Sequence, residues 1–78
     1  MDIKSIYSLF IQCDGVSTDS RKCPKDSMFI ALKGDNFDGN AFVENAIESG
    51  SKFALTCDEK RANNKTIFYF LYFIILKK

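Results

Sequence analysis

Apolar residues recur at helical spacing at the start of the chain. Five of them stand at positions i, i+3, i+4, i+7 and i+8: Ile3, Ile6, Tyr7, Phe10 and Ile11. This spacing is typical of one face of an amphipathic helix. Asp14-Gly15 follows as a stop signal, because glycine readily adopts the left-handed backbone conformation that ends many helices. We predict a helix over about residues 2–12.

The next apolar stretches are short and fit strands. A short strand is predicted around residues 15–18. Residues 28–32 (MFIAL) form a continuous apolar run between turn signals, which is typical of a strand covered on both faces. Residues 53–56 (FALT) read as a further strand, and the chain is apolar again from Thr66.

A second helix is predicted between these strands, over about residues 40–49. Phe42, Val43, Ala46 and Ile47 recur there at helical spacing, and Gly50 ends the segment. Strands that alternate with helices indicate parallel pairing. We therefore predict a small two-layer α/β domain with a mixed, partly parallel sheet and two main helices.

Length and charge narrow the classes of function. A chain of 78 residues has room for one small domain, which buries about 60% of its unfolded surface. Eleven basic and ten acidic residues leave a net charge of +1, which argues against a nucleic-acid or anionic-membrane surface.

Three cysteines are irregularly spaced, and the chain contains no histidine. Without a C-x-x-C pair we expect no metal site. We expect reduced thiols in a cytoplasmic protein, with Cys13 half-buried. The first ten residues, MDIKSIYSLF, do not have the pattern of a signal peptide.

The first polar segment of interest is TDSR, residues 18–21. It allows two interpretations. Asp19 and Arg21 can form a surface ion pair of small energetic value. Alternatively, Ser20 and Arg21 contact a polar ligand while Asp19 braces the loop by accepting backbone N–H groups. Ser20 has no histidine to act as its base, so a nucleophilic role is not expected.

The second polar segment is KGDNFDGN, residues 33–40, between a predicted strand and a predicted helix. As a connection, it would use Asp38 or Asn40 as the helix N-cap. As a binding loop, it offers acceptors, amide groups and an aromatic ring next to free helix N–H groups. It lacks the G-K-[ST] of a P-loop and the pattern of an EF-hand.

These motifs together resemble the N-terminal domain of the Mur ligases, which build the peptidoglycan stem peptide. GVSTDSRK (residues 15–22) and DSMFIALKGDNFDGNAFVENAIESGSKFAL (residues 26–55) carry the resemblance. It extends over roughly residues 3–70. The ligase that adds the terminal dipeptide is the nearer match, and the ligase that adds the third residue shares the motifs.

The resemblance implies that the domain holds the UDP part of a UDP-N-acetylmuramoyl-peptide. By position it places Ser20 and Arg21 at the uridine end, with Asp19 as the structural brace. The residues that it places around uracil and ribose, or close to the same ligand, are Asp35, Asn36, Phe37, Gly39 and Asn40. No catalytic residue is implied.

Mur ligases also use ATP and magnesium, bound by further domains. The 78 residues contain no G-K-[ST], so we expect no cofactor site here and no ligase activity from this chain alone. We divide the chain into the ligand-binding domain, residues 1–70, and an apolar tail, residues 71–78, that departs from the family pattern.

The apolar run at residues 67–76 (IFYFLYFIIL) allows three interpretations. It can mark a truncated ligase, it can contact a membrane although it is too short to span one as a helix, or it can be an edge strand on its own domain or on a second copy. The alternative function is therefore a small structural or interaction protein, or a non-functional remnant, that self-associates or contacts a membrane through this run.

Overall fold

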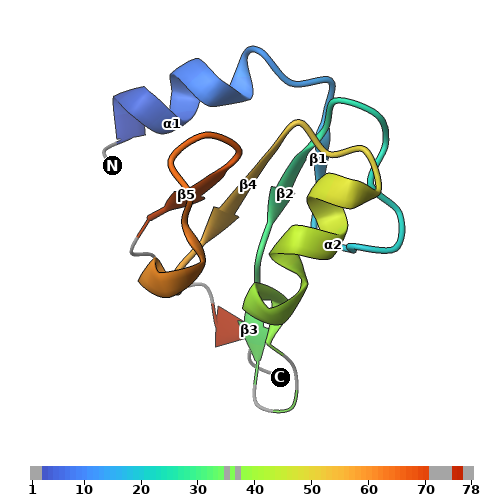
Figure 1. Ribbon diagram of the computed structural model, residues 1–78, viewed down its shortest axis with the longest axis vertical. Helices are drawn as coiled ribbons and strands as arrows, with labels where there is room; N and C mark the ends of the chain where they lie inside the picture. Colours follow the sequence, from blue (N-terminus) through green and yellow to red (C-terminus); the bar gives the residue numbers. More distant parts are fainter. Residues whose placement is uncertain (1–2, 35, 37, 71–74, 77–78) are drawn as a thin grey trace.

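A computed structural model describes residues 3–34, 36, 38–70 and 75–76. The elements follow in the order α1 (Ile3–Phe10), β1 (Val16–Ser17), β2 (Met28–Ile30), β3 (Lys33–Gly34), η1 (Gly39–Phe42), α2 (Val43–Glu48), β4 (Phe53–Thr56), η2 (Glu59–Arg61), β5 (Ile67–Tyr69) and β6 (Ile75–Leu76), where η denotes a 3-10 helix. Figure 1 shows the four strands of the main sheet side by side with α2 packed across them.

The main sheet has the strand order β1-β2-β4-β5, and all three pairings are parallel. The α/β class with two helices is thus confirmed. β3 and β6 form a separate parallel pair, and an isolated bridge between Lys33 and Asp38 is antiparallel. β2 and β4 are neighbours joined through α2, which is the standard βαβ connection. Because all four strands run the same way, the segments that follow β1 and β2 emerge at one end of the sheet.

The hydrophobic core lies between α2 and one face of the sheet. Val43 and Ala46 of α2 are fully buried there. They pack in a cluster with residues of the sheet and of the turn before β2: Cys23, Phe29, Ala31, Ala54 and Ile67. Small side chains on β4 and α2 let the helix approach the sheet closely, which keeps the N-terminus of α2 beside the strand ends.

The buried run at residues 28–32 behaves as the sequence predicts. Met28 and Phe29 are each 1% exposed although they point to opposite faces of the sheet. On the face away from α2, the rings of Phe53 and Phe68 meet edge to face with their centroids 5.7 Å apart. β2 is therefore covered on both faces.

Most other element predictions are confirmed within a few residues. The helix predicted over 2–12 is α1, and the strand predicted at 53–56 is β4. The helix predicted over 40–49 is divided, because its first turn is the 3-10 helix η1. Gly15 and Gly50 have φ of 99° and 123°, which is the left-handed region that favours glycine.

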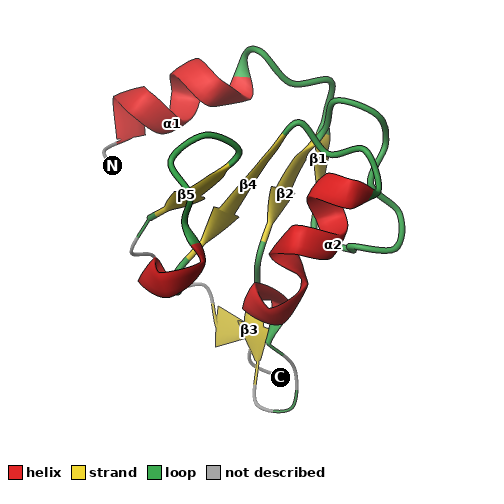
Figure 2. Ribbon diagram, in the orientation of Figure 1, coloured by secondary structure: helices red, strands yellow, loops and turns green. Residues whose placement is uncertain are grey.

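The apolar face of α1 is not part of the core. No residue of this helix is buried, and four apolar side chains in it or directly after it are largely open to solvent: Ile3 (69%), Tyr7 (60%), Phe10 (43%) and Ile11 (62%). Figure 2 shows α1 lying apart from the face that α2 covers. The amphipathic pattern therefore predicted the helix but not a packed face.

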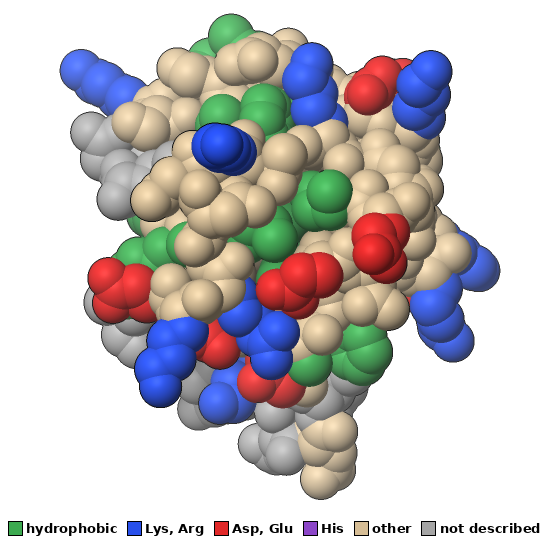
Figure 3. Space-filling view, viewed as in Figure 1, with side chains coloured by type: hydrophobic (Ala, Val, Ile, Leu, Met, Phe, Trp, Pro, Cys, Tyr) green, Lys and Arg blue, Asp and Glu red, His purple; other side chains and the backbone are tan. Residues whose placement is uncertain are grey.

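Charged side chains of both signs are interspersed on the face shown in Figure 3. An ion pair joins α2 to the segment after β4, from Arg61 Nη1 to a carboxylate oxygen of Glu44 at 3.2 Å. Among the described residues, no helix combines the length and the apolar character needed to cross a membrane.

Candidate functional site: a cavity between the TDSR turn and α2

The TDSR segment forms a tight turn directly after β1. The backbone N–H of Lys22 donates to the carbonyl of Asp19 at 3.0 Å, with aspartate at the first position where turns favour it. The Ser17 hydroxyl accepts the N–H of Asp19 at 3.1 Å and lies 3.0 Å from the carbonyl of Lys22. The turn is therefore held by its own backbone and by the last residue of β1.

Asp19 and Arg21 are linked in two ways. One carboxylate oxygen of Asp19 accepts the backbone N–H of Arg21 at 2.9 Å. The guanidinium group of Arg21 donates from Nε and Nη2 to the two carboxylate oxygens, at 3.1 and 3.2 Å. The surface ion pair is confirmed, and the Arg21 side chain remains 84% exposed.

This contact shifts the pKa of both groups. The hydrogen bond from the Arg21 side chain, with a further one from its backbone, lowers the pKa of Asp19 below its ordinary value. The same hydrogen bond raises the pKa of Arg21. Both side chains therefore remain charged at neutral pH.

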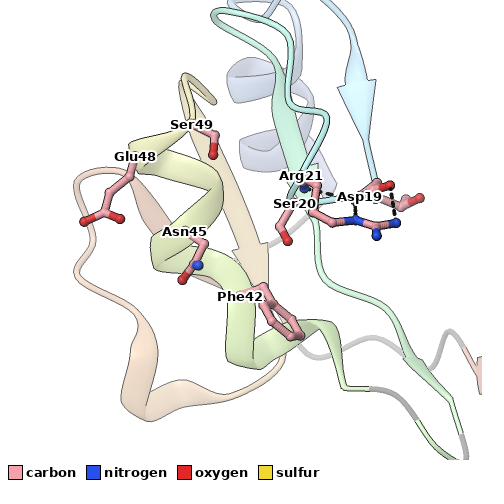
Figure 4. Close-up of a pocket in the computed structure, with 8 residues that line it drawn as sticks. Asp19, Ser20, Arg21, Phe42, Asn45, Glu48 and Ser49 are labelled. Atoms are coloured by element: carbon pink, nitrogen blue, oxygen red, sulfur yellow. Dashed lines mark hydrogen bonds and ion pairs between the residues drawn. The ribbon is translucent and has the colours of Figure 1, made fainter.

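A cavity of about 720 Å³ opens between this turn and α2. One wall is the turn itself, and the other is a face of the second helix. The residues that line it are Thr18, Asp19, Ser20, Arg21, Phe42, Asn45, Glu48 and Ser49. In Figure 4 the Ser20 side chain points across the gap toward α2, and the Glu48 carboxylate points away from the turn. Among the described residues, the Ser20 hydroxyl has no hydrogen-bond partner in the protein.

The helix wall of this cavity was not predicted from the sequence. Phe42 was assigned to the apolar face of the helix with Val43, but it is 38% exposed and lines the cavity. Phe42, Asn45 and Ser49 are spaced i, i+3 and i+7, so they share one helix face. The sequence shows that these residues share a helix face. Only the structure shows that this face lies opposite the TDSR turn.

The loop at residues 33–40 contributes structure at the start of η1. Asp38 is the N-cap: its carboxylate accepts the backbone N–H of Asn40 at 3.0 Å. The capping interpretation is therefore confirmed for Asp38. Gly39 lies against the backbone of Leu32, and a Cβ added at Gly39 would lie 2.8 Å from the nitrogen and the oxygen of Leu32. Only glycine fits this approach without movement of the chain.

Asn40 is buried, and its amide group is satisfied by the protein. Its Oδ1 accepts the Thr56 hydroxyl at 2.6 Å and the backbone N–H of Cys57 at 2.9 Å. Its Nδ2 donates to Asp38 at 2.8 Å and to the Cys57 sulfur at 3.2 Å. Asn40 thus fastens the start of the helical segment to the end of β4.

The residues singled out from the sequence fall into three groups. Ser20 and Arg21 line the cavity together with the brace Asp19. Gly39 and Asn40 are buried at the helix start and are not part of its lining, while Asn36 is exposed. Asp35 and Phe37 lie outside the described residues.

The three cysteines are free, and Cys13 is partly buried. Burial raises the pKa of Cys13 and of Cys23, so both thiols resist ionisation at neutral pH. The Cys13 thiol faces the carbonyl of Leu9 at 3.3 Å, which places it at the end of α1 and away from the cavity lining.

Comparison with known proteins gives a consistent result. A model described as "Mur ligase family, catalytic domain" matches residues 12–75. The chain is 56% identical over 36 residues to a UDP-N-acetylmuramoyl-tripeptide–D-alanyl-D-alanine ligase of Bacillus subtilis, a stretch that covers 46% of this chain and 8% of the relative. It is 36% identical over 58 residues to a UDP-N-acetylmuramoyl-L-alanyl-D-glutamate–2,6-diaminopimelate ligase of Rickettsia prowazekii, covering 74% of this chain and 12% of the relative.

The UDP-N-acetylmuramoyl-L-alanyl-D-glutamate–2,6-diaminopimelate ligase of Clostridium tetani is 33% identical over 67 residues, which cover 86% of this chain and 13% of the relative. The chain thus spans about a tenth of the length of these relatives. Two differently named ligases match, the shorter overlap having the higher identity, so the similarity identifies the family but not one member of it. Because the family model matches residues 12–75, which is most of this chain, the chain belongs to the Mur ligase family.

Proposed function

We propose that this chain binds the UDP part of a UDP-N-acetylmuramoyl-peptide, as the substrate-binding domain at the N-terminus of a peptidoglycan-precursor ligase. The observation that carries the proposal is the cavity between the TDSR turn and α2. It is lined by Arg21, by Phe42 and by Ser20, whose hydroxyl has no hydrogen-bond partner among the described residues. The names of two relatives specify UDP-N-acetylmuramoyl-peptides as their substrates.

Arg21 is proposed to contact the uridine end of such a ligand, where the resemblance places it. Its guanidinium group uses Nε and Nη2 for Asp19, which leaves Nη1 for another acceptor. Asp19 restrains the guanidinium group, so less side-chain entropy is lost when the nucleotide binds. Ser20, inside the cavity, offers a donor and an acceptor to a ribose or a base.

The loop residues complete the proposed site. Following the resemblance, Asp35, Asn36 and Phe37 are proposed to line the uracil and ribose part of the site. Gly39 and Asn40 fix the end of the loop. Gly39 packs against the backbone of Leu32, and the Asn40 side chain accepts a hydrogen bond from Thr56 of β4. Cytoplasmic location follows from the proposed substrate class.

Titration with UDP followed by NMR tests the proposal. UDP should shift the amide resonances of residues 18–21 and 34–40, and ADP at the same concentration should shift them less. Ser20→Ala should weaken UDP binding, while Ser8→Ala on α1, whose hydroxyl bonds only its own helix, should leave it unchanged. If millimolar UDP moves none of these amides, the proposal is wrong.

The domain alone is proposed not to ligate. ADP release can be measured after mixing this chain with ATP, UDP-muramoyl-tripeptide and D-alanyl-D-alanine. The signal should therefore not rise above background. Turnover by the 78-residue chain would contradict this part of the proposal while leaving UDP binding intact.

The alternative function, self-association through residues 67–76, concerns a segment that is only partly described. β6 (Ile75–Leu76) pairs with β3 inside the same chain. Sedimentation of the chain cut after Phe70 separates the two functions. Loss of oligomers on cutting would support the association function, and UDP binding that survives the cut would support the nucleotide site.

A further inference from the structure

β5 (Ile67–Tyr69) is the last strand of the main sheet, and one of its sides pairs with β4. Figure 1 shows it at one edge of the sheet. A strand edge presents N–H and C=O groups that can pair with another chain. The run that begins with β5, IFYFLYFIIL at residues 67–76, is rich in aromatic and β-branched residues, which is typical of segments that associate as strands.

The hydrogen bonds to β4 identify which residues of β5 face outward. The Ala54 N–H donates to the Thr66 carbonyl at 2.8 Å, so the main chain of residue 66 faces β4. Along a strand, the main-chain groups of successive residues point to opposite sides. Ile67 and Tyr69 therefore direct their N–H and C=O groups to the outer side of the sheet.

The turn before β5 occupies the outward groups of Ile67. The Ile67 N–H donates to Oδ1 of Asn63 at 2.9 Å. The Ile67 carbonyl accepts the backbone N–H groups of Asn63 at 2.9 Å and of Asn64 at 3.1 Å. Oδ1 of Asn63 also accepts the N–H groups of Lys65 and Thr66, each at 2.8 Å, which fixes the side chain there. Asn63 thus bonds Ile67 where a residue of a neighbouring strand would.

We propose that Asn63 closes the outer edge of β5 and so keeps this strand from pairing with β5 of a second copy. β5 has two outward residues, Ile67 and Tyr69, and closing one of them leaves too few positions for a ladder of hydrogen bonds. The pairing that is prevented would be antiparallel, because a two-fold axis sets each edge strand against itself. Asn63 is exposed, so a second copy could reach this edge if the side chain were removed. The proposal does not depend on UDP binding.

Amide hydrogen exchange tests whether the contact protects the edge. The Ile67 amide should exchange roughly fivefold faster in Asn63→Ala than in the unaltered chain, as expected for one lost hydrogen bond. Asn63→Asp keeps an acceptor oxygen at this position and should protect Ile67 as the unaltered chain does. If the Ile67 amide of the unaltered chain exchanges as fast as that of an unfolded peptide, the proposal is wrong.

Sedimentation velocity tests whether the contact prevents pairing. At equal concentration, Asn63→Ala should form more oligomer than the unaltered chain, and Asn63→Asp should not. Adding Tyr69→Pro to Asn63→Ala should reverse the association, because proline removes an outward N–H and leaves the hydrogen bonds to β4 in place.

Each variant is first checked for a dispersed amide spectrum. Where Asn63→Ala does not fold, Asn63→Gln replaces it, because the longer side chain moves the oxygen away from the Ile67 N–H. Equal amounts of oligomer in the substituted and unaltered chains would overturn the proposal. Association that survives Tyr69→Pro would do the same, since it would not use the edge of β5.

Discussion

The Thr56 hydroxyl donates to Oδ1 of Asn40 at 2.6 Å, and both residues are buried. This bond joins the start of the helical segment to the carboxyl end of β4, across 16 positions of sequence. It therefore fixes where the helix, and with it one wall of the cavity, stands relative to the sheet.

Asn40→Ala should destabilise the fold. It removes both halves of the amide and leaves the Thr56 hydroxyl and the Cys57 N–H without that partner, at a cost of about 1–3 kcal/mol in the free energy of unfolding. Urea denaturation measures this. Asn36→Ala, at an exposed asparagine, is the control and should change stability by less than about 0.5 kcal/mol. Equal midpoints for the two variants would contradict the role given to Asn40.

Gly39→Ala should also destabilise the fold, by overpacking. The added Cβ meets the backbone of Leu32 at 2.8 Å, and the rigid main chain there cannot yield as a side chain would, so about 1–3 kcal/mol is expected. Gly15→Ala is a useful comparison, because its Cβ meets nothing within 4 Å and only its φ of 99° is unfavourable. A Gly39→Ala variant with an unchanged urea midpoint would show that this approach is not close.

Truncation of two isoleucines should change the free energy of unfolding by very different amounts. Ile67 is 4% exposed and belongs to the core, whereas Ile11 after α1 is 62% exposed. Ile67→Ala should cost about 2–5 kcal/mol, because it leaves a cavity. Ile11→Ala should stay within about 0.5 kcal/mol. Urea unfolding of both variants decides this, and a large loss at Ile11 would mean that α1 packs on the domain.

The Asp19 carboxyl should titrate below its ordinary range. Arg21 lowers its folded-state pKa, so the contribution of the pair to stability is present above the unfolded pKa. That contribution is lost as the pH falls through the lowered folded pKa. Carboxyl NMR titration should show the pKa rising toward its ordinary value in Arg21→Gln, with a smaller rise in Arg21→Lys, which keeps the charge. An unchanged pKa in Arg21→Gln would exclude the side-chain contact as its main cause.

The local elements were predictable because their causes are local. The spacing of apolar residues at the start of the chain identifies α1, and the apolar run FALT coincides with β4. Asp38 could be named as an N-cap because the capping bond reaches only two residues along the chain. Glycines after two helices have the positive φ that their positions suggest.

The cavity could not be predicted, because its two walls come from segments more than 20 residues apart. TDSR was recognisable by its motif, but Phe42 and Asn45 gain their position only when the parallel pairing of β1, β2 and β4 sets α2 beside that turn. The exposure of α1 is of the same kind, since an amphipathic pattern does not say whether another surface covers it.

By itself the sequence determined the elements, the α/β class and the motifs of the Mur ligase family, because residue spacing acts over a few positions and ordered motifs can be read directly. Tertiary structure decided which of those segments line the same cavity. The buried bonds of Asn40 and the close approach at Gly39 hold α2 against the sheet, and that packing places a helix face opposite Ser20.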